Sequence, residues 1–169
     1  MILVDENDHP IGVMEKMQAH KEGLLHRAFS IFILNSQKEI LLQQRAFSKY
    51  HSPKLWTNAC CSHPYPNEST PAAANRRLFE EMGFNCQLIE IGEFTYYTKF
   101  DNDLIEHEYD HVFAGMYDGS INPNPAEVAD YKWLSTQKID ELVEMDKSQF
   151  TFWFHLAYPI FKKWLNKEY

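Results

Sequence analysis

The segment STPAAANRRLFEEMGF constrains the fold of this chain most, because helix signals mark both of its ends. Ser69 or Thr70 can cap the first turn, and Pro71 suits that turn because the N–H that proline lacks has no helical partner there. Gly83 is typical of the residue that ends a helix. Two apolar side chains four residues apart give the predicted helix one face that must pack on a neighbouring element.

Strand patterns lie on both sides of this helix, so it is expected to pack on a sheet. Residues 27–34 are β-branched and aromatic and predict a buried strand, which a polar turn joins to a returning strand at 40–44. Further strands are predicted at 87–100, 106–117 and 129–134, a long loop at 46–68, and helices near 136–145 and 148–167. The pattern predicts an α+β fold, a mixed β-sheet flanked by helices, in a single domain over residues 1–169.

The composition argues against several classes of protein. A net charge of −8 gives no basic surface, so nucleic acid is not an expected partner. The longest apolar run, 150–164, is broken by His155, Pro159 and two lysines, and it is too short and polar to span a membrane. Three cysteines and a charged residue as early as position 5 argue against a disulfide framework and a signal peptide. We therefore expect a cytoplasmic setting.

The stretch TNACCSHP places Cys60 and Cys61 side by side, just before His63. Adjacent cysteines do not close an ordinary disulfide, and the C-x-x-C spacing of a zinc knuckle is absent. Either another activity uses one of these thiols, or both are small buried hydrophobic residues.

The stretch EHE places two carboxylates on one face of a predicted strand. Side chains alternate along a strand, so Glu106 and Glu108 point the same way and His107 points the other way. Two neighbouring carboxylates repel each other unless a cation or a shared proton relieves them. An exposed strand face is the other interpretation.

Histidines and cations elsewhere in the chain could join these carboxylates. His20, His26 and His63 would complete an octahedral site of nitrogen and oxygen ligands for a divalent metal, although isolated histidines are usually only solvated. Arg45 and Lys49 enter the loop before the cysteines and could grip a phosphate. They could equally be ordinary surface charges.

The helix and the loop before it resemble the Nudix box, whose pattern is Gly, five residues, Glu, seven residues, Arg-Glu-aliphatic-any-Glu-Glu-any-Gly-aliphatic. Ser62 stands where the pattern has Gly, and Arg77 stands where it has Glu. Nudix hydrolases crowd carboxylates around metal ions to attack a diphosphate with water, so an arginine there exchanges a metal ligand for a phosphate anchor. The resemblance suggests that a diphosphate is held and not cut. By themselves these charges can also pair on the helix surface at four-residue spacing, Arg76 with Glu80 and Arg77 with Glu81. The matching positions are Glu68, Arg76, Leu78, Glu80, Glu81 and Gly83.

One branch of that superfamily combines the altered box with a TN-x-x-C-x-HP loop and an E-x-E strand. This chain carries TNACCSHP, NRRLFEEMG and EHE in the same order, and AHKEGLLHRAFS fits the N-terminal histidine pair of that branch. Over roughly residues 3–167 it therefore resembles the type I isopentenyl-diphosphate isomerases, and the resemblance implies an α/β/α Nudix-type fold.

The resemblance implies a role for each side chain of the candidate site. Cys61 aligns with the catalytic cysteine, Glu108 with the second catalytic residue, and Tyr96 with the tyrosine beside that acid. The implied metal ligands are His20, His26, His63, Glu106 and Glu108 in one site, and Glu81 with the backbone carbonyl of Cys61 in a second site, where Mg2+ bridges to the diphosphate. The implied substrate contacts are Lys16, Arg45, Lys49 and Arg77 at the diphosphate and Trp153 over the isoprenoid, with Cys60 and Cys86 structural.

The implied reaction converts isopentenyl diphosphate to dimethylallyl diphosphate by moving a double bond. Metal-bound Glu108, helped by Tyr96, would deliver a proton to one carbon, and Cys61 would take one from the opposite face, as a thiolate or through a relay. The face of Trp153 would stabilise the carbocation between the two transfers. The implied cofactors are Mg2+ on the diphosphate and a further Mg2+, Mn2+ or Zn2+ in the histidine site.

Two other functions stay open. A Nudix pyrophosphohydrolase would share the fold and the need for Mg2+ but would have no use for Cys61 or Trp153. A non-catalytic module that binds a diphosphate or a metal would leave the cysteine incidental. The expected partner is a small isoprenyl diphosphate, without nucleic acid or membrane, and the chain could be a monomer or a homodimer.

Overall fold

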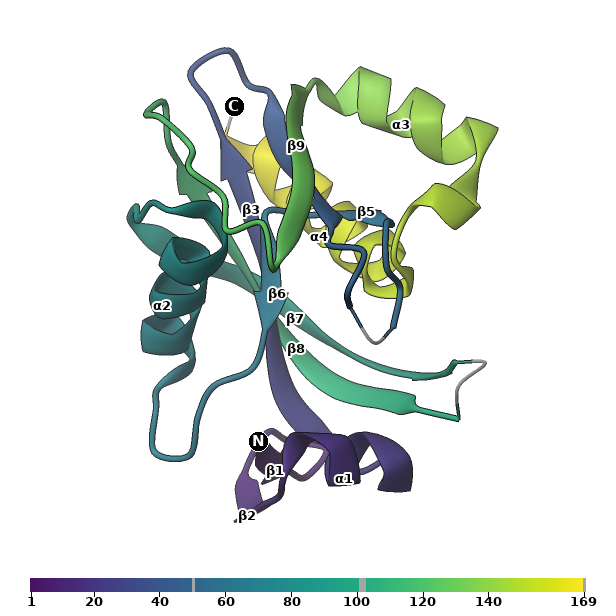
Figure 1. The fold of residues 1–169 in the computed structure, drawn as a ribbon. Helices are drawn as coiled ribbons and strands as arrows, with labels where there is room; N and C mark the ends of the chain where they lie inside the picture. The colour runs from purple at the N-terminus through teal and green to yellow at the C-terminus, as the bar shows by residue number, and fades with distance from the viewer. Residues whose placement is uncertain (50, 101–102, 169) are drawn as a thin grey trace.

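The computed structural model describes residues 1–49, 51–100 and 103–168, in which nine strands form one mixed sheet with helices around it (Figure 1). The strands are β1 (Ile2–Val4), β2 (Pro10–Val13), β3 (His26–Leu34), β4 (Ile40–Arg45), β5 (Trp56–Thr57), β6 (Cys60–Ser62), β7 (Leu88–Lys99), β8 (Ile105–Met116) and β9 (Val128–Leu134). The helices are α1 (Lys16–Glu22), α2 (Thr70–Met82), α3 (Thr136–Met145) and α4 (Phe152–Glu168), with a 3-10 turn at Lys147–Gln149.

Strand β3 is the centre of the sheet. Along one edge it pairs in parallel with β8, from His26 opposite Glu108 to Leu34 opposite Met116. Along its other edge β1, β6 and β4 follow one another, each antiparallel to it. The predicted hairpin of β3 and β4 forms only at its turn, where Leu34 pairs with Ile40, because β4 then pairs with β9 instead.

Alternation of side chains along β3 gives the protein two apolar cores. Phe29, Ile31 and Ile33 pack beneath α2, whereas Phe32 and Leu34 belong to the core on the opposite face, with α3 and α4. Both faces of the strand are buried, which explains its nearly continuous apolar sequence. Figure 1 shows α2 on one side of the sheet and α3 and α4 on the other. The predicted mixed sheet flanked by helices is confirmed.

The N-terminal segment forms a small unit whose second strand and helix were not predicted. β1 and β2 pair with each other, and α1 ends at Gly23, whose φ of 65° is left-handed. Helix α1 packs against β8, at the lower end of the sheet in Figure 1. With only seven residues it is too short for a helical period to be read from the sequence. This unit brings Lys16 and His20 to the edge of the sheet.

Two predictions of secondary structure need correction. Residues 46–68, expected to be a loop, contain β5 and β6, because the cysteine stretch pairs with β3. The second tail helix begins at Phe152 and not near 148, because Phe150 is extended and bridges to Trp56, and the Thr151 N–H donates to the Trp56 carbonyl. The other predicted elements lie within one residue of their bounds. None of the helices in the described ranges is long and apolar enough to cross a membrane.

Helix α2 has the predicted caps, and its C-terminal glycine supports a stability prediction. Ser69 accepts the Ala72 N–H, and Gly83 adopts a left-handed φ of 79°. A Cβ at Gly83 would lie 2.3 Å from the Asn122 carbonyl oxygen. Gly83→Ala is therefore expected to lower the free energy of unfolding by at least about 2 kcal/mol, measured by urea denaturation.

Gly12→Ala is the control for this prediction. A Cβ there would meet only the Leu3 side chain, at 3.9 Å, so the expected change is within about 0.5 kcal/mol. Equal losses in the two variants would contradict the role assigned to Gly83.

Candidate active site

The candidate site lies on one face of the β3–β8 pair, at the end of the sheet near α1. Glu106, Glu108 and Asp110 are buried on β8, and the parallel register sets His26 opposite Glu108. His107 points the other way and hydrogen-bonds a backbone carbonyl at the end of α1, at 3.0 Å. The prediction that the two glutamates of EHE share a face is confirmed, since one tyrosine hydroxyl contacts both of them.

Three histidines meet Glu108, although they come from α1, β3 and the end of the cysteine stretch. Nδ1 of His20 and Nδ1 of His26 each lie 2.7 Å from a backbone carbonyl oxygen. A carbonyl only accepts, so Nδ1 of each ring carries the hydrogen and Nε2 carries the lone pair. His63 Nε2 lies 2.8 Å from Glu108 Oε1. One ligand atom from each of the four residues lies within 4.8 Å of the others.

This donor set fits a divalent metal ion. Burial lowers the pKa of His20, and it lowers the pKa of His63 to about 3, so these imidazoles are neutral. Although burial opposes it, the His26 and His63 rings beside Glu108 hold the pKa of its carboxyl group well below the usual range. His26 Nε2 is buried and has no hydrogen-bond partner among the described residues. Neutral imidazoles around an ionised carboxylate are the ligands of a metal.

Glu106 lies beside this cluster, and Tyr96 joins it to Glu108. Tyr96 Oη lies 2.9 Å from Glu106 Oε2 and 2.7 Å from Glu108 Oε2. One hydroxyl hydrogen cannot serve two carboxylates fully, so a further proton or a cation is required there. Burial and the charge of Glu108 raise the pKa of Glu106 well above its usual range, which favours a proton on Glu106 while no cation is bound.

Cys61 enters the site, and its neighbour Cys60 does not. Side chains alternate along β6, so Cys60 packs into the core beneath α2, against which Cys86 also packs. Cys61 Sγ lies 3.1 Å from Asn58 Oδ1 and accepts the Trp153 Nε1 hydrogen at 2.9 Å. Burial raises the pKa of the Cys61 thiol to about 12, so its sulfur carries a proton, which it donates to Asn58.

Trp153, in the first turn of α4, covers Cys61. Its Nε1 also lies 3.0 Å from Thr57 Oγ1, and the guanidinium carbon of Arg45 lies 5.1 Å from its ring centroid. That distance suits a cation–π contact. Arg45 also donates to the carbonyl oxygens of His51 at 3.2 Å and Ser52 at 3.1 Å. The predicted diphosphate contact Arg45 therefore also holds the wall of the site.

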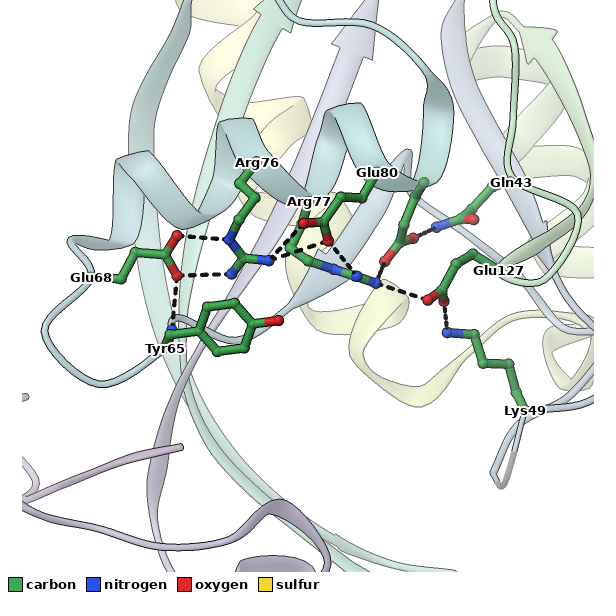
Figure 2. Close-up of polar contacts among 9 residues, drawn as sticks. Gln43, Lys49, Tyr65, Glu68, Arg76, Arg77, Glu80 and Glu127 are labelled. Atoms are coloured by element: carbon green, nitrogen blue, oxygen red, sulfur yellow. Dashed lines mark hydrogen bonds and ion pairs between the residues drawn. The ribbon is translucent and has the colours of Figure 1, made fainter.

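The two arginines of α2 have different surroundings (Figure 2). Arg76 forms a bidentate pair with Glu68 at 2.7 and 2.8 Å and reaches Glu80 at 3.2 Å. Its guanidinium also lies over the Tyr65 ring, 4.0 Å from the centroid. The predicted pairing of Arg76 with Glu80 is confirmed, and Arg76 ties the loop before α2 to the helix.

Arg77 stands at the position where the Nudix pattern has a glutamate. It points to the mouth of the site, a space that Lys16 and Lys49 also line. It donates to Glu81 at 2.5 Å, as predicted, and lies 3.3 Å from Glu127, which also pairs with Lys49 (Figure 2). Glu81 accepts a hydrogen bond from Gln43 at 3.0 Å. Cations and carboxylates therefore lie side by side at the mouth, where they can receive an anion together with a metal ion.

These side chains surround three adjoining spaces. Every residue predicted to be catalytic or to contact substrate lines an inner cavity of about 50 Å³. A mouth of about 460 Å³ shares Lys16, Lys49 and Arg77 with that cavity. An outer apolar groove of about 700 Å³ shares only His51 with the inner cavity among the described residues. The predicted ligands His20, His26 and Glu81 are buried and do not line that cavity.

Sequence reasoning missed two residues of the site. His51 lies 3.1 Å from Glu106 Oε1, and burial lowers its pKa to about 2, so it is a neutral member of the cavity wall. Glu127 bridges the cations of the mouth. Neither residue lies in a recognisable sequence pattern. The only signal in the sequence was that His51 follows the predicted phosphate contact Lys49 by two residues.

Comparison with known proteins places this geometry in a class. Residues 24–154 match the NUDIX domain. The crystal structure of DR0079 from Deinococcus radiodurans superimposes with a TM-score of 0.77 at 18% identity, covering 94% of this chain and 97% of that one. The fold and the domain match define a Nudix-domain protein.

Two proteins named isopentenyl-diphosphate Delta-isomerase are much more similar in sequence. The one from Burkholderia multivorans is 49% identical, with 99% of this chain and 98% of that protein covered. The one from Serratia proteamaculans is 51% identical, with 91% and 86% covered. This chain belongs to the isopentenyl-diphosphate Delta-isomerase family, which confirms the resemblance seen in its motifs.

Proposed function

We propose that this chain interconverts isopentenyl diphosphate and dimethylallyl diphosphate, a step of isoprenoid biosynthesis. The proposal is carried by one observation: the sulfur of Cys61 and the Glu108–Tyr96 pair line the same inner cavity. Family membership supports the same reaction. A 1,3 proton shift needs two proton-transfer groups that reach different carbons of one substrate, and this cavity supplies them.

The Glu108–Tyr96 pair carries out one of the two proton transfers, and Cys61 carries out the other. Tyr96 joins Glu108, at 2.7 Å, to Glu106, which holds a proton. A proton passed along this link to Glu108 is given to the terminal carbon of the double bond, and the sulfur of Cys61 takes a proton from the carbon next to the diphosphate-bearing one. In this direction the proton that the Cys61 thiol carries first leaves through a relay, and the thiolate then takes the substrate proton. In the reverse direction the thiol is the donor and Glu108 the acceptor, so atoms and charges balance both ways.

The hydrocarbon carries positive charge between the two transfers, and the cavity must protect it from water. The indole of Trp153 lies next to Cys61, where its face can stabilise a tertiary cation by up to about 2 kcal/mol. The walls leave about 50 Å³, room for only a few water molecules, since each needs roughly 10–15 Å³ of such space. Exclusion of water prevents capture of the cation as an alcohol.

The diphosphate serves as the handle. Lys16, Lys49 and Arg77 face the mouth and would hold its oxygens, while Glu81 and the Cys61 carbonyl would hold a Mg2+ that bridges to it. The cluster of His20, His26, His63 and Glu108, with Glu106 beside it, would hold a further Mg2+, Mn2+ or Zn2+. Such an ion would fix the position of Glu108, and its positive charge would make the protonated Glu108 a stronger acid. Three unpaired cysteines are in keeping with a reducing cytosol as the setting.

Hydrolysis of the diphosphate is the alternative, and one observation weighs against it. In the Nudix pattern a glutamate stands where this chain has Arg77, so this position supplies no carboxylate for a metal ion. The Arg77 side chain also pairs with the carboxylate of Glu81. A hydrolase would also gain nothing from Cys61 or Trp153.

Incubation of the purified protein with isopentenyl diphosphate and Mg2+ in D2O tests the proposal. Proton and phosphorus NMR should show deuterium entering the methyl groups as dimethylallyl diphosphate forms, with both phosphates retained, because the added proton comes from a solvent-exchanged group. A chelator should stop the reaction. Release of phosphate, or unchanged substrate with metal-replete protein, would contradict the proposal.

A further inference from the structure

The ring of His51 is held firmly at one end of the inner cavity. Its Nε2 lies 3.1 Å from Glu106 Oε1. Its face stacks on Phe100, with the ring centroids 5.0 Å apart and an angle of 19° between the ring planes. Its edge meets Trp153, with the centroids 5.8 Å apart and an interplanar angle of 76°. The residue is only 7% exposed. Contacts on three sides keep the ring in one orientation.

This ring separates two spaces of very different size. On its inner side lies the cavity of about 50 Å³ with the reacting groups, and on its outer side lies the apolar groove of about 700 Å³. The groove walls include Leu55, Phe100, Phe150 and Phe152. A groove of that volume and character is large enough for a hydrocarbon chain.

The same two elements contribute to both spaces, so the cavity and the groove are neighbours. On β7, Tyr96 lines the cavity and Thr98, two residues further on the same face, lines the groove. At the start of α4, Trp153 lines the cavity and Phe152 lines the groove. Among the described residues, only His51 belongs to both linings.

The substrate has one orientation that satisfies its two ends. The diphosphate belongs at the mouth with Lys49 and Arg77, which the cavity and the mouth share. The hydrocarbon end then points away from the mouth, toward the Trp153 and His51 end of the cavity. A longer hydrocarbon would meet the His51 ring before it reached the groove.

Building on the function proposed above, we propose that His51 determines specificity by restricting the enzyme to a five-carbon chain. The ring closes the cavity toward the apolar groove. Removal of the ring would join the two spaces and admit substrates with longer alkyl chains at the carbon that bears the methyl group.

The test compares isopentenyl diphosphate with 3-methylideneheptyl diphosphate, in which a butyl chain replaces that methyl. For wild type, the ratio of kcat/KM for the long substrate to that for isopentenyl diphosphate should be below about 0.01, because each misfitted methylene costs 10-fold or more. His51→Ala should raise this ratio at least about tenfold, even if loss of the Glu106 contact lowers kcat for both substrates. His51→Phe, which restores the bulk without Nε2, should return the ratio to the wild-type value.

His155→Ala is the matched control, because His155 lines the groove without touching the inner cavity. It should leave the ratio unchanged. An unchanged ratio in His51→Ala, or a wild-type enzyme that already converts both substrates equally, would overturn the proposal.

Binding of unreactive ligands tests His51 independently of turnover. Titration calorimetry with the saturated compounds 3-methylbutyl and 3-methylheptyl diphosphate in the presence of Mg2+ gives a ratio of Kd values. His51→Ala should shift this ratio at least about tenfold toward the longer ligand, and an unchanged ratio would overturn the proposal. Failure of wild type to isomerise isopentenyl diphosphate would refute the proposed function, while the Kd ratio would still decide the role of His51.

Discussion

Cys61→Ala is expected to reduce kcat for isopentenyl diphosphate by at least about 10³-fold, with little change in KM. General acid–base groups contribute about 10²–10⁴-fold, and the substituted alanine has no atom that can exchange a proton with the substrate. The proposed diphosphate contacts, Lys49 and Arg77, lie elsewhere, so binding should survive. The measurement is the initial rate of dimethylallyl diphosphate formation, followed by proton NMR.

Cys60→Ala is the control for this result, since it removes the adjacent thiol from the core beneath α2. It should keep near-wild-type kcat and lose about 1 kcal/mol of unfolding free energy, because a small apolar contact is lost. If Cys61→Ala retained a tenth of wild-type kcat, the sulfur could not be the second proton-transfer group. Equal losses from both variants would point to a disturbed fold.

Glu108→Gln is expected to reduce kcat by a similar factor and also to weaken metal binding by about 10–100-fold. The amide cannot deliver a proton, and it replaces an ionised oxygen that lies 2.8 Å from His63 Nε2. Two measurements are needed: kcat at saturating Mg2+, and metal affinity by titration calorimetry. Saturation with metal separates loss of the acid from loss of the ligand.

Glu144→Gln is the matched control, because Glu144 lies on α3 outside the inner cavity, is exposed and belongs to neither group of possible metal ligands. It should change neither quantity. A Glu108→Gln variant that recovered wild-type kcat at high metal concentration would show that Glu108 is a ligand and not the proton donor.

Much of the site could be predicted because short stretches carry it. The EHE stretch fixed the shared face of Glu106 and Glu108 by strand alternation alone. The same rule decides between the adjacent cysteines, but only after β6 is known to be a strand, and that segment was expected to be a loop. The resemblance in motifs, not the local pattern, selected Cys61.

Other parts of the site depend on pairings that no local pattern encodes. His26 and Glu108 face each other because β3 and β8 pair in parallel with that one register. His20 reaches them from α1, which is too short to be read from its period. His51 and Glu127 lie in irregular segments, so their places follow from the surrounding packing and not from any repeat.

The sequence by itself determined the longer strands and helices and the kinds of chemistry present. Period, caps and turn residues act over a few positions, so the caps of α2 and most strand bounds could be read directly. The tertiary structure decided which side chains meet. Strand pairing and burial set the candidate metal ligands, the protonated sulfur and the wall at His51, because they arise from contacts between segments far apart in the chain.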